Sequence, residues 1–140
     1  MRNTINIHAG VLPYYRGSSS NFWCIADERL ELVGVTVYSL IVGVDSGPIL
    51  FHSIPRALSW DPFELGMEAV KGFHLALVNH IMSRTLFGLC AENQDRPKQL
   101  RHSNLDAQVA ACYLNQLPSR RDIREALLRR DEQLQYCKTE

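Results

Sequence analysis

The sequence predicts an α/β domain, and three observations support that prediction. Apolar and β-branched residues fill three short runs, at residues 4–8, 32–40 and 48–54. A long amphipathic helix is expected to follow them from Asp61. The chain has 140 residues, of which 46% are hydrophobic, so one small domain can build a core. Strands followed by a helix in this order are typical of a sheet that packs against helices.

The run at 4–8 predicts a strand that leads into a loop at 9–20, which is rich in Gly, Pro and Ser. A serine among residues 18–20 is expected to cap a short helix over residues 21–26. The two remaining strand runs, at 32–40 and 48–54, come next. Because a Gly-rich turn at 43–47 separates those two runs, they are expected to form a hairpin-like unit.

The helix that begins at Asp61 has the clearest start signal in the chain. Asp61 is a good N-cap residue, Pro62 suits the first helical position, and Glu64 completes an approximate capping box. Gly88 is expected to end the helix. Apolar side chains at helical spacing predict a stripe that packs on the sheet. The predicted stripe consists of Phe63, Met67, Val70, Phe73 or His74, Leu77 and Ile81.

The last part of the chain is expected to be a linker followed by helices. Residues 89–103 are polar and contain a proline, which predicts a loop. Residues 105–117 predict a helix, and Ser119 is placed to begin a final one. Arginines between 120 and 130 alternate there with acidic residues. This pattern favours a solvated helix face over an RNA-binding surface.

The composition excludes a strong overall attraction to nucleic acid or to membranes. Lys and Arg number 15, and Asp and Glu also number 15, so the formal charges balance. The sequence shows no signal peptide and no apolar run long enough to span a bilayer. No C-x-x-C pair occurs, so we expect reduced thiols, a cytoplasmic location and no metal site. The cysteines are Cys24, Cys90, Cys112 and Cys137.

Asn6, His8 and Asp45 form the candidate catalytic group. Positions two apart in a strand share a face, so Asn6 and His8 project together. Asp45 lies in the turn after a strand, where α/β sheets commonly build their sites. An amide, an imidazole and a carboxylate suit acyl transfer to an amine, since they can stabilise the oxyanion and accept a proton. Taken singly, each of these residues more often has an ordinary structural role, and only the flanking sequence favours catalysis.

The sequence around these residues resembles the folate-dependent formyltransferases, which include methionyl-tRNA formyltransferase, glycinamide ribonucleotide transformylase and sugar N-formyltransferases. The first family motif reads Asn-x-His-Pro-Ser-Leu-Leu-Pro and continues into an aromatic, basic, Gly-containing loop. The second places Gly-x-Ser/Thr-Val a fixed distance before Asp-x-Gly. The resemblance is specific over residues 4–52 and weaker through the helix after them. The matching residues are Asn6, His8, Leu12, Pro13, Arg16, Gly17, Gly34, Thr36, Val37, Asp45 and Gly47.

The resemblance implies a Rossmann-like sheet with flanking helices, of which this chain would be the C-terminal part, followed by a helical tail. It implies transfer of a formyl group from 10-formyltetrahydrofolate to an amine through a tetrahedral intermediate, with no metal. It also implies that Asn6, His8 and Asp45 are the catalytic residues. Residues that would border the folate are Gly10, Val11, Leu12, Pro13, Gly43 and Val44.

The chain also departs from the family pattern. Ala9 and Gly10 replace the family's Pro and Ser, which predicts a looser loop after His8. Tyr38 stands where several members have His, and Ile41-Val42 stand where members usually carry an Asp.

Family members carry the first βαβ units ahead of the Asn-x-His strand. We therefore expect residues 1–88 to be a partial catalytic domain and residues 89–140 a linker with a helical extension. The chain would then be a fragment, a truncated product, or a protein whose exposed parallel sheet a homodimer or another segment covers.

The function has three competing interpretations at this point. The leading one is a formyltransferase of one-carbon metabolism. The second is a non-catalytic remnant or partner-binding module, and the third is a hydrolase of 10-formyltetrahydrofolate that uses water as nucleophile. Within the first, a small amine such as an amino sugar is favoured over tRNA. The predicted helical tail does not resemble the β-barrel domain that methionyl-tRNA formyltransferases carry.

Overall fold

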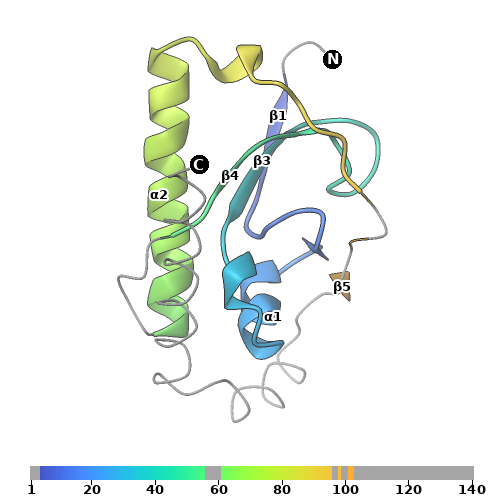
Figure 1. Ribbon diagram of the computed structural model, residues 1–140, viewed down its shortest axis with the longest axis vertical. Helices are drawn as coiled ribbons and strands as arrows, with labels where there is room; N and C mark the ends of the chain where they lie inside the picture. Colours follow the sequence, from blue (N-terminus) through green and yellow to red (C-terminus); the bar gives the residue numbers. More distant parts are fainter. Residues whose placement is uncertain (1–3, 56–60, 96–97, 99–100, 103–140) are drawn as a thin grey trace, which may run out of the picture.

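A computed structural model of the chain describes residues 4–55, 61–95, 98 and 101–102 (Figure 1). A three-stranded antiparallel sheet, in the order β1-β3-β4, forms its centre. The long helix α2 runs beside this sheet, and the short helix α1 lies near its lower end in the view (Figure 1). The elements are β1 (Ile5–His8), β2 (Tyr15–Arg16), α1 (Ser20–Ala26), η1 (Leu30–Leu32), β3 (Val35–Ser39), β4 (Ile49–Ser53), α2 (Pro62–Met82), η2 (Leu86–Gly88) and β5 (Arg101–His102).

The register of the sheet gathers polar side chains on one face. Asn6 of β1 lies opposite Tyr38 of β3, and His8 lies opposite Thr36. Residues that lie directly opposite each other in an antiparallel pair project to the same face. β3 and β4 also pair antiparallel, with an irregularity between Val37 and Tyr38, which confirms the expected hairpin-like unit.

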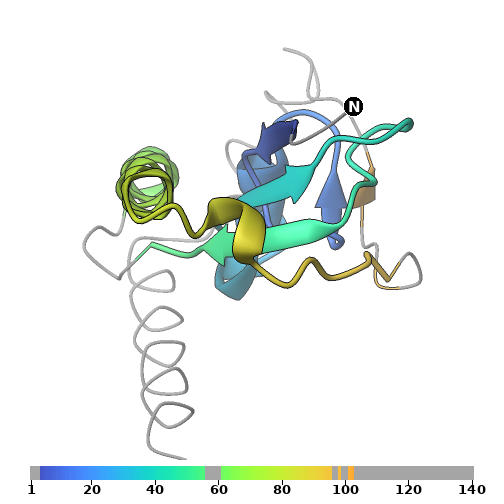
Figure 2. The same cartoon turned by 90° about the horizontal axis from the view of Figure 1, so that it is seen from above.

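The other face of the sheet packs against α2. Val35 and Val37 of β3 form one core cluster with Ala69 and Phe73 of α2. Figure 2, which looks down the axis of α2, shows the helix standing to one side of the sheet. The apolar face of the strands therefore holds the sheet against α2, and the polar face carries Asn6, His8, Thr36 and Tyr38.

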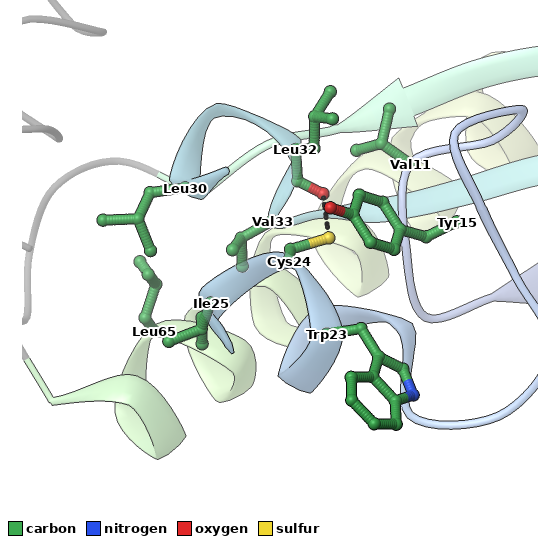
Figure 3. Packing of buried hydrophobic residues seen from close by; sticks show 9 residues of the cluster. All are labelled: Val11, Tyr15, Trp23, Cys24, Ile25, Leu30, Leu32, Val33 and Leu65. Atoms are coloured by element: carbon green, nitrogen blue, oxygen red, sulfur yellow. Dashed lines mark hydrogen bonds between the residues drawn. The ribbon is translucent and has the colours of Figure 1, made fainter. Parts of the chain in front are cut away.

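A second cluster joins the loop after β1, the helix α1 and the start of α2. Cys24 lies at its centre, where its thiol donates a hydrogen bond to the carbonyl oxygen of Leu32 (3.2 Å; Figure 3). Burial raises the pKa of this thiol, so it stays protonated. Trp23 and Leu65 belong to the same cluster. The cluster anchors the loop on which part of the polar site stands.

Helix α2 begins as predicted, and Val70, Phe73 and Leu77 of the predicted stripe pack with the sheet. The Asp61 carboxylate accepts hydrogen bonds from the backbone N–H groups of Phe63 and Glu64, with Pro62 at the first helical position. The predicted stripe is wrong at its ends, because Phe63, Met67 and Ile81 are exposed. The helix is apolar on more than one side, and the sheet and α1 contact only the side next to them. The buried residues are Leu65, Ala69 and Phe73.

Two boundaries and one helix cap also differ from the predictions. The strand expected from residue 32 begins at Val35, because a 3₁₀ turn, η1, occupies Leu30–Leu32. Helix α2 ends at Met82 rather than Gly88, and Gly88 instead closes the short turn η2. The expected serine cap of α1 is absent, since Ser19 takes a left-handed conformation (φ 58°) and its side chain makes no cap bond.

The segment after α2 is more involved in the fold than a linker. Glu92 forms an isolated antiparallel bridge with Ile49, and β5 pairs in parallel with β2. The helices predicted at 105–117 and after Ser119 lie outside the described residues. The described three-stranded sheet is antiparallel throughout, so the expected parallel sheet is not seen among these strands. Strand β1 lies at one edge of the three-stranded sheet. That a homodimer or another segment covers the sheet stays a prediction.

Candidate functional site

His8 is buried at the end of β1, with only 7% of its side chain exposed. Its Nε2 atom lies 2.8 Å from the carbonyl oxygen of Tyr15 and 3.0 Å from the hydroxyl of Ser20. A carbonyl oxygen can only accept, so Nε2 carries a proton in this arrangement. The other ring nitrogen, Nδ1, lies 3.4 Å from Oδ2 of Asp45.

Two effects act on the protonation of His8 in opposite directions. Burial lowers its pKa from the ordinary value of 6.5, and the Asp45 carboxylate opposes that shift. With Nε2 protonated, a neutral ring directs the lone pair of Nδ1 at the Asp45 carboxylate. A proton delivered to Nδ1 removes this repulsion. His8 and Asp45 together therefore form a proton-accepting pair, with Nδ1 as the basic atom.

Asp45 stands on the turn between β3 and β4 and reaches back to the end of β1. Its backbone lies in the left-handed region (φ 46°), which Asp tolerates better than most residues. The backbone N–H of Gly17 donates to Oδ2 at 3.1 Å, and the Tyr38 hydroxyl donates to Oδ1 at 2.8 Å. The side chain is 14% exposed, so the carboxylate is anchored on several sides and still reaches solvent.

Asn6 is joined to this group through Tyr38. Its Nδ2 atom donates to the Tyr38 hydroxyl at 2.6 Å, and its Oδ1 accepts the backbone N–H of Ile7 at 2.9 Å. Asn6 is exposed, whereas Tyr38 is buried. The structure thus joins Asn6 and Asp45 through hydrogen bonds to the Tyr38 hydroxyl, and it places Nδ1 of His8 beside the Asp45 carboxylate.

The loop after His8 is closely held rather than loosened, which corrects the expectation at Gly10. The Thr36 hydroxyl donates to the carbonyl oxygen of Gly10 (2.6 Å) and accepts the backbone N–H of Leu12 (3.0 Å). A side chain at residue 10 would overlap Ser20 and lie 2.9 Å from Nε2 of His8. Gly10 therefore leaves the space in which Ser20 approaches His8.

The residues expected to border the folate fall into two groups. Gly10, Val11, Leu12 and Pro13 are buried, and the last two are joined by a cis peptide bond. Val11 packs in the cluster around Cys24, and Leu12 packs with Tyr38 and Ile49.

Gly43 and Val44, by contrast, are exposed on the turn that carries Asp45, with Val44 66% exposed. Contact of Gly43 and Val44 with folate stays a prediction. Of the six residues expected to border the folate, these two are the ones exposed to a ligand in this structure.

The turn that carries Asp45 is fastened by residues outside the predicted site. Gln94 donates from Nε2 to the carbonyl oxygen of Gly47 (2.7 Å) and accepts at Oε1 from the Arg16 guanidinium (2.6 Å). Arg16 also lies 3.5 Å from the carbonyl oxygen of Val44. Gly47 itself fits because a side chain there would overlap the carbonyl oxygen of Ser39. Arg16 and Gln94 thus position the turn that presents Asp45.

A cavity of about 410 Å³ lies elsewhere, between α1 and the start of α2. Its lining is apolar, and Asn6, His8 and Asp45 are not part of it. The cavity is lined by Asn21, Phe22, Ile25, Pro62, Phe63, Gly66 and Met67.

Within the described residues, no three His, Cys, Asp or Glu side chains come together as a metal-binding group. In the same part of the chain, no helix combines the length and apolar character needed to cross a membrane.

Sequence reasoning missed three residues of the polar site. Ser20 is one of three serines from which the sequence predicts a helix cap. Tyr38 differs from the family pattern, and Gln94 lies in the predicted linker. The signal for Tyr38 was its strand position, because a partner of β1 that places a residue opposite Asn6 puts its side chain beside the amide. No comparable sequence signal points to Gln94, which reaches Gly47 across a long separation.

Comparison with known proteins identifies similar sequences and similar solved structures. No family model matches the chain. A methionyl-tRNA formyltransferase of Synechococcus sp. (strain JA-3-3Ab) is 39% identical in an alignment of 133 residues, and the alignment covers 78% of this chain and 40% of that protein. The enzyme of the same description from Trichlorobacter lovleyi is 46% identical over 46 residues, 33% of this chain and 14% of that protein. The chain therefore spans at most 40% of the length of these two relatives.

Solved structures extend the likeness to the fold. A sugar N-formyltransferase from Shewanella sp. FDAARGOS_354 superposes with a TM-score of 0.62 at 23% identity, covering 90% of this chain and 50% of that one. A formyltransferase from Anoxybacillus kamchatkensis, in complex with UDP-4,6-dideoxy-4-formamido-L-AltNAc and tetrahydrofolate, gives 0.56 at 20% identity, covering 88% and 63%. These likenesses confirm the predicted Rossmann-like formyltransferase fold. Over the segment that it shares with these proteins, the chain belongs to the folate-dependent formyltransferase family.

Proposed function

We propose that this chain carries the formyl-transfer centre of an enzyme that moves a formyl group from 10-formyltetrahydrofolate to a primary amine. The observation that supports this most strongly is the hydrogen-bonded chain Asn6–Tyr38–Asp45 with His8 beside it. This group combines the exposed amide donor of Asn6 with the partly exposed carboxylate of Asp45, and the imidazole of His8 lies beside that carboxylate as a base. Acyl transfer to an amine needs both, at neighbouring positions.

Asn6 supplies the hydrogen bond to the reacting carbonyl. One N–H of its amide is used on Tyr38, and the amide carries a second N–H. This second N–H donates to the formyl oxygen, which gains negative charge as the amine attacks. A donor held in place in this way stabilises the charge without having to reorganise during the reaction.

Asp45 and His8 handle the proton. The attacking amine must lose one proton, and the tetrahydrofolate nitrogen that leaves must gain one. Asp45 accepts the proton from the amine, and Nδ1 of His8 shares it across the 3.4 Å contact. The pair then returns the proton to the leaving nitrogen, so that the protons balance over the reaction. Burial of His8 keeps its ring unprotonated before the reaction begins.

The exposed turn beside Asn6 fits the formyl donor. When bound, 10-formyltetrahydrofolate supplies the formyl group as a reactive N-formyl amide. Gly43 and Val44 present backbone and an apolar side chain next to Asp45, which suits a flat heterocycle with hydrogen-bonding edges. The buried residues 10–13 support this surface from beneath through Leu12, which packs on Tyr38.

The acceptor in this proposal is a small amine, with an amino sugar as the preferred class. The solved structures with the same fold include sugar N-formyltransferases, one of them in complex with a sugar nucleotide and tetrahydrofolate. The sequence relatives are methionyl-tRNA formyltransferases, which makes tRNA the second acceptor to try. Both acceptors present a primary amine to the same chemistry.

The test is an assay of formyl transfer from 10-formyltetrahydrofolate to amino-sugar nucleotides and to methionyl-tRNA, with the Asp45→Asn variant beside the wild type. Asn keeps the shape of the side chain and also tolerates the left-handed backbone of residue 45. Formyl transfer that falls about 100-fold or more in this variant supports the mechanism. Unchanged activity contradicts it.

Two controls separate this proposal from its alternatives. Calorimetry with a folate analogue that gives no heat, on a folded wild-type chain, favours a non-catalytic binding module. Formate released from the donor without any amine favours a hydrolase.

A further inference from the structure

Tyr38 occupies the centre of the polar site, between Asn6 and Asp45. Only 1% of the residue is exposed, and its ring packs with Leu12 and Ile49. Its hydroxyl lies at the polar end, 2.6 Å from Nδ2 of Asn6 and 2.8 Å from Oδ1 of Asp45. The side chain thus anchors in the core and touches two of the three proposed catalytic residues.

The hydrogen bonds of this group run in a single direction. Oδ1 of Asn6 accepts the backbone N–H of Ile7, which fixes Nδ2 on the side of Tyr38. The Tyr38 oxygen accepts from that nitrogen, so its own proton points to Asp45. To reverse the chain, the amide would have to turn over and give up the bond to Ile7. The direction also requires Asp45 to be a hydrogen-bond acceptor, as an ionised carboxylate is.

The phenol keeps its proton over the whole working range. Burial, and after it the hydrogen bond to Asp45, raise the pKa of Tyr38 to about 12. The hydroxyl is therefore a constant donor to Asp45 at neutral pH, whatever the protonation of His8.

We infer that Tyr38 is a positioning residue that sets the orientation of the Asn6 amide and the Asp45 carboxylate through one shared hydroxyl. The inference rests on the proposed function, in which Asn6 binds the formyl oxygen and Asp45 accepts the proton. The hydroxyl holds one N–H of Asn6 and so directs the second towards the reacting group. At the same time it holds one carboxylate oxygen of Asp45 and leaves the other, Oδ2, towards His8.

The first test does not depend on activity. Tyr38→Phe removes only the hydroxyl and keeps the ring that packs on Leu12 and Ile49. Nuclear magnetic resonance of the full chain follows the side-chain amide protons of Asn6 in the wild type and the variant. We expect the Asn6 signal to shift and its exchange with solvent to speed up about tenfold, because a hydrogen bond of ordinary net strength is lost. Tyr14→Phe is the matched control, since Tyr14 packs at the side of the other core cluster.

The second test uses the reaction. In Tyr38→Phe we expect kcat to fall about tenfold while KM for the formyl donor stays within about twofold, because orientation is lost and binding is not. Tyr38→His restores a side chain that can donate to Asp45, so part of the lost kcat should return. A purely structural role would lower both parameters with the folded fraction and would show no such recovery.

The two tests distinguish failure of the role inferred for Tyr38 from failure of the proposed function. An Asn6 amide signal and exchange rate that are unchanged in Tyr38→Phe overturn the role of Tyr38, whether or not the chain transfers formyl groups. A wild type that transfers none overturns the proposed function, and the amide measurement still decides what Tyr38 does. Should Tyr38→Phe fail to fold, the amide measurement is made on Tyr38→His, where a retained Asn6 signal supports the inference and a solvent-like signal opposes it.

Discussion

The Ser20 hydroxyl lies 3.0 Å from Nε2 of His8, in space that is open because residue 10 has no side chain. Ser20 is buried, and its hydroxyl also donates to the carbonyl oxygen of Gly17 at 3.2 Å. Gly10 and Ser20 are therefore a fitted pair on one side of the His8 ring. The pair holds the ring so that Nδ1 faces Asp45.

This pairing predicts that Gly10→Ala destabilises the fold. The new Cβ would overlap Ser20 and come within 2.9 Å of Nε2 of His8, both of which are buried. Overpacking of this kind costs about 1–3 kcal/mol of the free energy of unfolding. Urea unfolding of the variant and the wild type measures the loss.

The double variant Gly10→Ala with Ser20→Gly provides the control. Removing the Ser20 side chain relieves the overlap, so the two changes together should cost less than their sum. Strict additivity of the two losses would contradict the idea that Gly10 and Ser20 are fitted to each other.

The burial of His8 predicts how stability depends on pH. Its pKa is lowered in the folded chain from the ordinary value of 6.5, so the unfolded chain binds a proton first as the pH falls. The free energy of unfolding should therefore be highest above about pH 7 and decline as the pH falls through 6.5 and below. Denaturant unfolding at a series of pH values measures this slope.

His8→Gln identifies the source of that slope. A side chain that does not titrate in this range should flatten the dependence on pH. The dependence should not vanish, because desolvation also lowers the pKa of His52. His74→Gln, on the exposed side of α2, is the matched control variant. If His8→Gln were as pH-dependent as the wild type, burial of His8 would not be the cause.

Gln94 should matter for both stability and catalysis although it lies far from Asp45 in the sequence. Gln94→Ala removes the hydrogen bonds to the Gly47 carbonyl oxygen and to the Arg16 guanidinium. We expect a loss of about 1–3 kcal/mol in the free energy of unfolding, because partly buried groups lose their partner. Formyl transfer should fall as well, since the turn with Asp45 is less firmly held.

Gln94→Glu separates the two bonds. The carboxylate can still accept from Arg16, but it cannot donate to the carbonyl oxygen of Gly47. A loss close to that of Gln94→Ala would show that the bond to Gly47 holds the turn. Wild-type stability and activity in both variants would rule out a positioning role for Gln94.

The contrast between His8 and Gln94 explains how far the sequence could predict the site. The spacing of Asn6 and His8 follows from the two-residue period of a strand, and Asp45 from its place after the next strand. These are local rules, and the structure brings the three side chains together. The contact between Gln94 and Gly47 depends on how the chain returns after α2, which no local pattern encodes.

For the fold as well, local signals were predictable from the sequence and long-range packing was not. The start of α2 was predicted correctly because Asp61 and Pro62 act on their own neighbours. The stripe was predicted correctly only at Val70, Phe73 and Leu77, which pack with the sheet. It was wrong elsewhere because α2 carries apolar residues on several sides, and only the packing of the sheet and α1 selects among them. Ser20 shows how packing can override a local signal. Serine favours helix caps, but here its side chain makes a buried contact with His8.

The observed burial along α2 predicts a large loss of stability at one residue and almost none two positions away. Leu65 is fully buried against the cluster around Cys24, whereas Phe63 is 75% exposed. Leu65→Ala should lower the free energy of unfolding by about 2–5 kcal/mol, because it leaves a cavity in the core. Phe63→Ala should change it by no more than about 0.5 kcal/mol, although the larger side chain is removed. Urea unfolding of both variants gives the comparison, and a larger loss at Phe63 than at Leu65 would mean that another surface covers Phe63.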